Sequence, residues 1–381
     1  MVGRSPRDTL LPSSRPSIDE EEIAEVVACL RSGWITAGPR VEQFERDFAA
    51  LTGARHALAF SSATAGLHCA YWALDLRPGD EIVCPSLTWP ATVNMIVAVG
   101  GAPVFADIDP RTLQIDPAGV ERVVTERTRA IVPVHFAGAP ADMDALREIA
   151  GTRIALIEDA AHALGAELRG RKIGSGGNVA VFSFHATKLI TTAEGGMMVT
   201  DDADLAARAR LFRFHGVERD AWRAYGTGAA LHYDTVLAGF KYNMTDMAAA
   251  LGIHQLRKVE RFVARRAAIA ARYLAELADL PGVELPAAPS YPHRHAWQLF
   301  PLLVGERDAF AARLREANIA VGLHFEAVHT SSFHRGRGAL LPVTDRICAK
   351  ILSLPLFPAM TDADVDDVVF AVRRVAHALS I

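Results

Sequence analysis

Lys188 is the residue whose surroundings most favour chemistry. It ends the run S-F-H-A-T-K (183–188), which follows a short apolar stretch at 179–182 and precedes T-T-A-E-G-G (191–196). A lysine just past the end of a strand can face a cleft, where a partly desolvated amine can form a Schiff base. A solvated surface lysine is the commoner case for any single lysine, so the interpretation depends on the other motifs.

Asp159 is the second candidate. It lies in E-D-A-A-H (158–162), directly after the apolar run 154–157. Ligands of doubly wound sheets bind at the carboxyl ends of the strands, and a buried carboxylate there needs a partner. Asp159 can therefore pair with the protonated ring nitrogen of a pyridoxal cofactor, or it can simply cap the next helix. Taken alone, the motif leaves both possibilities open.

The segment S-S-A-T-A-G (61–66) is a candidate phosphate site. It lies between a strand-like run at 56–60 and a helical stretch that begins near Ala63. Free N–H groups at a helix N-terminus bind phosphate, although serine and threonine are also ordinary helix caps. No G-x-G-x-x-G fingerprint opens a strand–helix unit, which weighs against a nicotinamide-binding Rossmann domain.

The elements around these residues alternate between strands and helices. Strand-like runs occupy residues 81–84, 103–106, 130–134, 154–158 and 179–184, and helical periodicity marks 63–74, 89–99, 117–124 and 141–150. This alternation predicts an α/β fold with a doubly wound, mostly parallel sheet. Near residue 245, N-M-T-D (243–246) predicts the start of one long helix reaching about Leu280. Strand-like runs at 297–304 and 319–325, and helices at 308–317 and from about Asp362, follow it. We therefore expect a large α/β domain over residues 1–250 and a smaller α+β domain over 251–381.

Composition limits the classes of function. The 381 residues carry 40 basic and 44 acidic side chains, a formal net charge of −4. No global field therefore favours nucleic acid or anionic lipid, and no apolar stretch approaches the roughly 20 residues of a membrane span. The first sixteen residues lack the apolar segment of a secretory signal, so we expect a cytoplasmic protein. The cysteines (29, 69, 84 and 348) form no C-x-x-C pair and are expected to be buried thiols, and we predict no metal site.

Taken together, these motifs resemble the DegT/DnrJ/EryC1/StrS family of sugar-nucleotide aminotransferases, which are fold-type I enzymes that use pyridoxal 5'-phosphate (PLP). The resemblance covers essentially the whole chain. It includes S-G-W-I-T-A-G-P (32–39), P-S-L-T-W (85–89), P-V-H-F-A-G (133–138), K-Y-N-M (241–244) and S-L-P-L-F-P (353–358). Within the family, A-G-A-P-A-D-M-D (137–144), A-E-G-G (193–196), H-A-W (295–297) and G-L-H-F (322–325) most resemble members that make UDP-4-amino-4-deoxy-L-arabinose for lipid A modification.

The resemblance implies a role for each matching residue. Lys188 is expected to be the Schiff-base lysine and proton shuttle, and Asp159 the partner of the pyridine nitrogen. The other expected cofactor-binding residues are Trp89 stacked on the ring, His162 near the ring and its phenolic oxygen, Ala63, Thr64 and Ser183 around the phosphate, and Asn243 reaching in from a neighbouring subunit. A tryptophan face can cover a pyridinium, and an asparagine amide can donate to phosphate without adding charge. The family's active site therefore implies a homodimer.

The implied reaction moves the amino group of L-glutamate, leaving 2-oxoglutarate, to C4 of a nucleotide-linked 4-ketosugar, with UDP-4-keto-pentose as the first choice. The alternative is a UDP- or dTDP-4-keto-6-deoxyhexose in glycan or antibiotic sugar synthesis. Sugar dehydratases of this family carry histidine in place of the lysine, so Lys188 favours transamination. A non-catalytic sensor with this fold is a distant alternative, since no helix-turn-helix accompanies the motifs. His324, His329, His334, Arg335 and Arg337 form either a hydrated loop or a contact for the substrate's pyrophosphate.

Overall fold

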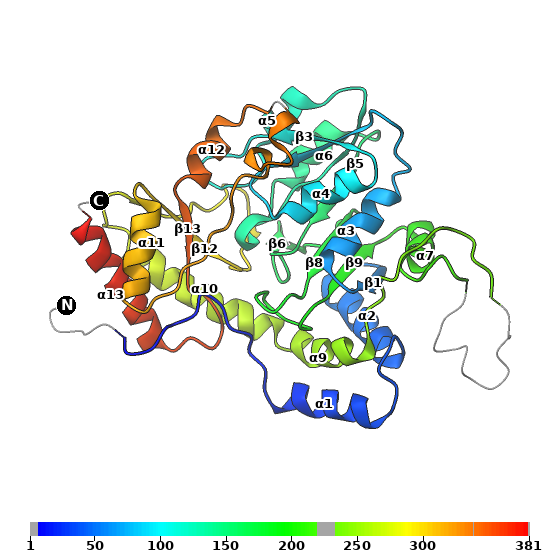
Figure 1. Cartoon of the computed structure of the whole chain (residues 1–381), viewed down its shortest axis with the longest axis horizontal. Coiled ribbons are helices and arrows are strands. Elements are labelled where there is room, and N and C mark those ends of the chain that lie inside the picture. Colours follow the sequence, from blue (N-terminus) through cyan, green and yellow to red (C-terminus); the bar gives the residue numbers. More distant parts are fainter. Residues whose placement is uncertain (1–6, 219–232, 338, 380–381) are drawn as a thin grey trace.

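A seven-stranded sheet forms the centre of the molecule in the computed structural model, which describes residues 7–218, 233–337 and 339–379 (Figure 1). Its strand order is β1-β9-β8-β5-β4-β2-β3. The strands are β1 (His56–Phe60), β2 (Glu81–Pro85), β3 (Ala102–Ala106), β4 (Thr128–Ile131), β5 (Ala155–Asp159), β8 (Val179–Ser183) and β9 (Gly196–Thr200). The pairs β2–β3, β2–β4, β4–β5 and β5–β8 are parallel, which confirms the predicted α/β class.

Strand β9 runs opposite to its two neighbours in the sheet. The sequence pattern did not predict a strand there. It pairs antiparallel with both β1 and β8, and all five of its residues are buried. Continuous burial is expected of a strand that is covered on both faces. Because β9 inserts between β1 and β8, its first residue, Gly196, pairs with Phe60 at the end of β1 and with Ser183 at the end of β8.

Helices cover both faces of this sheet. One core contains Phe44 and Phe48 of α2 (Pro39–Thr52), and the other contains Tyr71 of α3 (Ala63–Trp72) and Ile96 of α4 (Pro90–Ala98). Neighbouring residues of β1 divide between the two, since Ala57 and Ala59 join the first core and Leu58 and Phe60 the second. In the part of the chain that the structure describes, the other helices around the sheet are α1 (Glu20–Arg31), α5 (Pro117–Val123), α6 (Met143–Ala150), α7 (Ala203–Phe212) and α9 (Asp246–Leu256).

A second, antiparallel sheet lies in the C-terminal part of the chain. It consists of β10 (Val283–Glu284), β12 (Phe300–Val304) and β13 (Ile351–Leu354), and it shares a core with α10 (Val259–Glu276), α11 (Arg307–Glu316) and α13 (Asp362–Ala378). Two further elements are α12 (Pro342–Cys348) and a small sheet of β6 (Glu167–Leu168), β7 (Arg171–Lys172) and β11 (His293–Arg294). The start of α13 at Asp362 is confirmed. The division into domains at residue 250 stays a prediction.

Two expectations about this part were wrong. The long helix is two helices, because α9 ends at Leu256 and α10 begins at Val259. Residues 319–325 form no strand and make only isolated bridges, Ile319 with Leu11 and Gly322 with Ser353. The partner of Ile319 comes from the N-terminal segment, which the local pattern around 319 cannot reveal.

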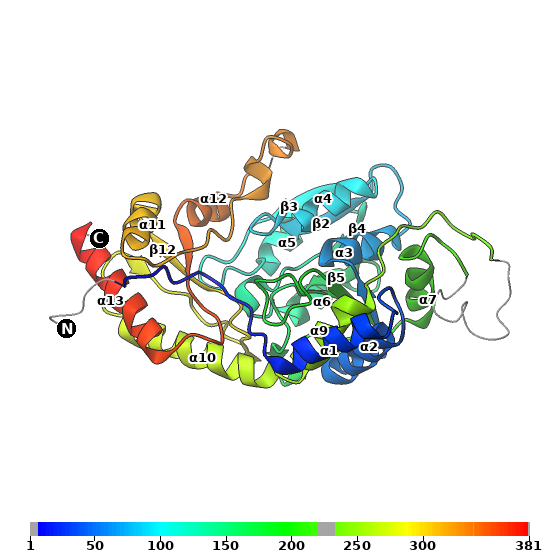
Figure 2. The same ribbon diagram turned by 60° about the horizontal axis from the view of Figure 1, so that its bottom comes forward.

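The N-terminal segment (residues 7–19) crosses from the C-terminal part to α1. Leu11 exchanges backbone hydrogen bonds with Asn318 (2.9 Å) and Ala320 (2.9 Å), and Figure 2 shows the segment running from beside α13 toward α1. The four cysteines are buried free thiols, as predicted. Within the described residues, no helix combines the length and apolar character needed to cross a bilayer, and no cluster of three or more His, Cys, Asp or Glu is placed to hold a metal.

Candidate active site

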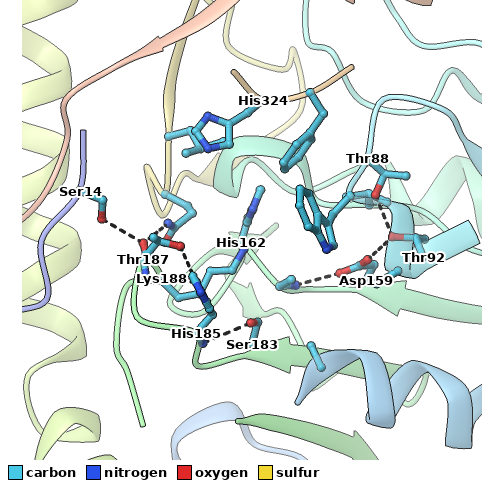
Figure 3. A pocket seen from close by; sticks show the side chains of 18 of the residues that line it. Ser14, Thr88, Thr92, Asp159, His162, Ser183, His185, Thr187, Lys188 and His324 are labelled. Atoms are coloured by element: carbon cyan, nitrogen blue, oxygen red, sulfur yellow. Dashed lines mark hydrogen bonds between the residues drawn. The ribbon is translucent and has the colours of Figure 1, made fainter. Parts of the chain in front are cut away.

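A cavity of about 520 Å³ lies at the carboxyl ends of β5 and β8. Its wall combines residues of the large sheet, the second sheet and the N-terminal segment (Figure 3). Of the residues expected from the sequence, seven line it: Ala63, Thr64, Trp89, Asp159, His162, Ser183 and Lys188. The edge of the sheet therefore brings together motifs that lie more than a hundred residues apart in the chain.

Asp159 is held by donors on both oxygens. Its Oδ2 accepts a 2.7 Å hydrogen bond from Thr92 Oγ1, and its Oδ1 accepts one of 3.1 Å from the Ala161 amide. Because the Thr92 hydrogen points to the carboxylate, the 2.8 Å contact between Thr88 and Thr92 requires Thr88 to donate. The carboxyl group is thus buried and oriented, with lone pairs remaining for one more donor in the cavity.

Lys188 reaches the cavity from the turn after β8, where its amide donates to the carbonyl of His185 (2.9 Å). Burial lowers the pKa of the Lys188 ammonium to about 8, although the negative charge of Asp159 opposes that shift. A usable fraction of the amine is therefore neutral near physiological pH. A neutral amine is the form that attacks a carbonyl.

The start of α3 forms a cradle for an anion. Ser62 caps the helix by accepting from the Ala65 amide (3.1 Å), and Ala63 and Thr64, the first two residues of the helix, line the cavity. Amides of a first helical turn lack partners within the helix and can bind an anion. Gly196 of β9 passes directly against this turn, since a Cβ on Gly196 would lie 2.4 Å from the Ala63 nitrogen and 2.5 Å from the Ser62 carbonyl carbon. Ser183, which pairs with Gly196 in the sheet, also lines the cavity. This cradle fits a phosphate group.

Aromatic rings line the opposite part of the wall. Trp89 is 63% exposed, and its ring lies 6.0 Å from that of Phe325, which in turn stacks on His162 (5.9 Å, 21°). Burial, followed by the charge of Lys188, holds the pKa of His162 well below its usual range. The His162 Nδ1 is buried without a hydrogen-bond partner among the described residues. An exposed indole face and an unsatisfied neutral imidazole beside Lys188 and Asp159 fit an aromatic cofactor such as PLP.

His324 also faces the cavity (Figure 3). Burial and the neighbouring charge of Lys188 lower its pKa to about 4, and its Nδ1 lies 3.0 Å from Ser353 Oγ. The other members of the predicted basic cluster do not line the cavity. His329 is buried between Ser86 (2.8 Å) and Asp345 (3.1 Å), and His334 contacts Asn94 (2.9 Å). Arg335 and Arg337 lie on a short exposed turn.

Asn243 differs from the other predicted cofactor residues, because it does not line the cavity of its own chain. Its side-chain oxygen accepts a hydrogen bond from Lys241, and its Nδ2 donates to the Met244 carbonyl (3.2 Å). Its backbone bridges Phe60, at the end of β1.

Several residues of the wall were missed by sequence reasoning. Ser13 and Ser14 of the N-terminal segment line the cavity, and Ser14 Oγ donates to the Thr187 carbonyl at 3.3 Å. Gln298 Nε2 donates to the same carbonyl at 2.8 Å. Thr92 was missed as well, although it follows the P-S-L-T-W motif by three residues. The N-terminal serines give no local signal, because only the fold brings residue 14 to residue 187.

Comparisons with known proteins agree with this chemistry. The profile of the DegT/DnrJ/EryC1/StrS aminotransferase family matches residues 16–373. Spr1654 of Streptococcus pneumoniae, assigned as a sugar aminotransferase, superposes in its PMP form with a TM-score of 0.91 at 31% identity, covering 97% of this chain and 100% of that one. Its PLP form superposes with a TM-score of 0.90.

Two further solved structures are similar over their whole length. DesV of S. venezuelae, in complex with a ketimine intermediate, is 34% identical with a TM-score of 0.88, covering 96% of this chain and 99% of DesV. Helicobacter pylori PseC, an aminotransferase involved in the biosynthesis of pseudoaminic acid, is 27% identical with a TM-score of 0.90, covering 97% and 100%. The predicted fold type, enzyme class and PLP cofactor are confirmed, and the chain belongs to the DegT/DnrJ/EryC1/StrS aminotransferase family.

Proposed function

We propose that this enzyme transfers the amino group of L-glutamate to C4 of UDP-4-keto-pentose, giving 2-oxoglutarate and UDP-4-amino-4-deoxy-L-arabinose. This is the reaction of UDP-4-amino-4-deoxy-L-arabinose–oxoglutarate aminotransferase, which serves lipid A modification in the cytoplasm. The observation that carries the proposal is the shared cavity of Lys188 and Asp159. There an amine with a pKa of about 8 faces the same space as a carboxylate fixed by Thr92.

We assign the binding of PLP to the residues around that space. Ala63, Thr64 and Ser183 hold the phosphate, Trp89 covers one face of the ring, and His162 lies near the ring and its phenolic oxygen. Asp159 keeps the ring nitrogen protonated. When bound, the cofactor supplies an electron-poor ring that takes up the electron pair released when a C–H bond of the amino donor is broken.

The chain's own residues supply the proton transfers. Lys188 binds the cofactor through its Nζ. Once free, that nitrogen takes the proton from the C–H bond of the amino donor and later delivers a proton to C4 of the sugar. Its lowered pKa suits both tasks, because the neutral amine accepts a proton and the ammonium gives it back near neutral pH. Burial and the charge of Lys188 keep His324 neutral at that pH. His324 therefore adds no second positive charge beside Lys188.

The wall on the Lys188 side suits a sugar. Ser13, Ser14, Gln298 and Ser353 offer hydroxyl and amide groups, and no arginine lines the cavity within the described ranges of the chain. Neutral donors and acceptors of this kind match sugar hydroxyls. The choice of a pentose rests on the motifs at 137–144, 193–196 and 322–325.

A homodimer is part of the proposal. Ile23, Val27 and Leu30 share one face of α1 and are 48%, 36% and 52% exposed, so a second copy can bury them. Asn243 lies outside the cavity of its own chain, consistent with a role at the site of the partner.

A single-turnover experiment tests the sugar. The enzyme is converted to its pyridoxamine phosphate form with L-glutamate, freed of 2-oxoglutarate, and mixed with UDP-4-keto-pentose or dTDP-4-keto-6-deoxyhexose. We expect the visible band of bound PLP to return, with one equivalent of amino sugar, only for the pentose. Return with the hexose alone moves the substrate to the alternative class, and no response to glutamate contradicts the amino-transfer proposal.

A further inference from the structure

Gln255, in the last turn of α9, occupies the centre of a buried polar chain outside the cavity. The side chain is 1% exposed. Its Oε1 accepts from the Thr191 amide (3.3 Å), and its Nε2 donates to the Ser17 carbonyl and to Glu22 Oε1, both at 2.8 Å. Because an amide N–H can only donate and a carbonyl can only accept, the orientation of the Gln255 amide is fixed by its partners.

The far side of Gln255 is anchored by an ion pair. Lys258 Nζ donates to both oxygens of Glu22 (2.6 and 2.8 Å) and to Asp19. Burial alone lowers the pKa of Lys258, but hydrogen bonds to Asp19 and Glu22 outweigh it and raise the pKa above its usual value. Glu22 is fully buried and also accepts from the Asp19 amide (3.0 Å). The row of buried polar side chains therefore begins at the ion pair of Lys258 with Glu22, near the start of α1.

The near side of Gln255 ends in the loop that carries Lys188. Thr191 lies three residues after Lys188 and is 3% exposed. Its Oγ1 donates to the Phe184 carbonyl (3.1 Å) and accepts from the Ala193 amide (2.9 Å), and the Thr192 amide also donates to Phe184 (3.0 Å). The loop is therefore folded back onto the end of β8. At Thr191 it is joined to α9 by the hydrogen bond to Gln255.

We propose that Gln255 is a positioning residue that fixes the 189–193 loop, and through it Lys188, relative to the N-terminal segment. This inference rests on the proposed role of Lys188. The same amide holds the carbonyl of Ser17, three residues after Ser14, which lines the cavity beside Thr187. One side chain thereby sets the distance between two walls of the site.

The chemistry of the chain favours positioning over simple core filling. An apolar side chain would fill the position of Gln255, whereas a fully satisfied polar network specifies one arrangement. The three hydrogen bonds of Gln255 join three segments that are distant in sequence: the N-terminal segment with the start of α1, the lysine loop, and α9.

The test compares Gln255→Met with Thr344→Val. Gln255→Met keeps the size of the side chain and removes all three bonds. Thr344 is also fully buried and donates to Asp107 (2.6 Å), but it does not line the cavity, so Thr344→Val removes a buried hydrogen bond elsewhere. In the cofactor-free protein we expect the 189–193 amides to exchange with solvent at least about tenfold faster in Gln255→Met and unchanged in Thr344→Val.

A second readout uses bound PLP without substrates. The midpoint of the pH titration of its visible absorbance depends on the surroundings of Lys188, so we expect it to move by about half a unit or more in Gln255→Met. Unchanged exchange and an unchanged midpoint in Gln255→Met overturn the proposal.

The wild-type protein provides a check that needs no variant. The Thr191 amide itself should exchange slowly, and rapid exchange there overturns the proposal even if no Gln255 variant folds. The exchange experiments require no cofactor. Failure of the wild type to bind PLP or transfer amino groups therefore contradicts the proposed function alone.

Discussion

Thr92 and Asp159 lie 67 positions apart in the sequence, and a 2.7 Å hydrogen bond from Thr92 Oγ1 joins them in the wall of the cavity. The threonine belongs to the first turn of α4 and the aspartate ends β5, so the bond links a helix to the strand edge. Thr88 completes a relay of hydroxyl groups behind the carboxylate. The side chain of Asp159 is therefore oriented before any ligand binds.

Replacing Thr92 by valine tests this relation. The substitution preserves the shape of the side chain and removes a hydrogen bond to a charged group, a contact worth about 1.5–3 kcal/mol. We expect the affinity for PLP to fall about tenfold to a hundredfold, measured by titration of its visible absorbance. Thr344→Val, which removes a similar threonine–aspartate bond away from the cavity, should bind PLP like the wild type. Equal affinities in both variants contradict the role of Thr92.

The pH dependence of cofactor capture follows from Lys188. Burial lowers its pKa to about 8, so the neutral fraction of the amine rises with pH up to that value and then levels off. The rate at which the cofactor-free protein binds PLP covalently should increase about tenfold per pH unit well below 8 and flatten above it. Stopped-flow absorbance measures this rate. A bend near 10.5, the ordinary value for lysine, would show that the amine is solvated instead.

Gly196 should be essential for phosphate binding for a steric reason. A methyl group there would lie 2.4 Å from the Ala63 nitrogen, so Gly196→Ala must displace the first turn of α3. We expect the affinity for pyridoxal phosphate to fall at least about tenfold, and that for pyridoxal, which lacks the phosphate, to change much less. Gly305→Ala is the matched control, because its added methyl group has no atom within 4 Å. An equal loss for both ligands would place the effect outside the phosphate cradle.

Mixing two defective variants tests whether Asn243 acts across a dimer. Lys188→Ala lacks the amine and Asn243→Ala lacks the amide, so a mixed dimer has one site with both groups only if Asn243 serves the partner. After joint unfolding and refolding, about half of the dimers are mixed, and activity should reach about a quarter of the wild-type value. Activity no greater than the average of the two parents would show that Asn243 does not act across the dimer.

The sequence predicted that Lys188 and Asp159 would lie near each other, because each follows an apolar run and parallel strands end at one common edge. Both residues line one cavity, and their catalytic roles stay a prediction. Thr92 was not identified, because a threonine in a first helical turn is also an ordinary residue there. Ser14 was inaccessible to local reasoning, since its place beside Thr187 depends on the path of residues 7–19 across the whole molecule.

The errors of fold have similar causes. The segment 319–325 has the composition of a strand, but β13 pairs with β12 along its length and meets the segment only at Gly322. The histidines at 329 and 334 read as polar loop residues, yet each is buried against a partner some 240 positions away in the sequence. Local composition indicates which secondary structure and exposure a residue favours. Strand pairing at 319–325 and the burial of the two histidines depend instead on contacts with residues distant in sequence.

The most direct measurement locates the lysine that binds the cofactor. The purified protein is saturated with PLP, reduced with borohydride, digested and analysed by mass spectrometry. We expect one stoichiometric label on Lys188, and a Lys188→Ala variant that binds PLP without a covalent label. A label on another lysine, or a Lys188→Ala variant that retains full multiple-turnover activity, would contradict the role of Lys188 as the lysine that binds the cofactor.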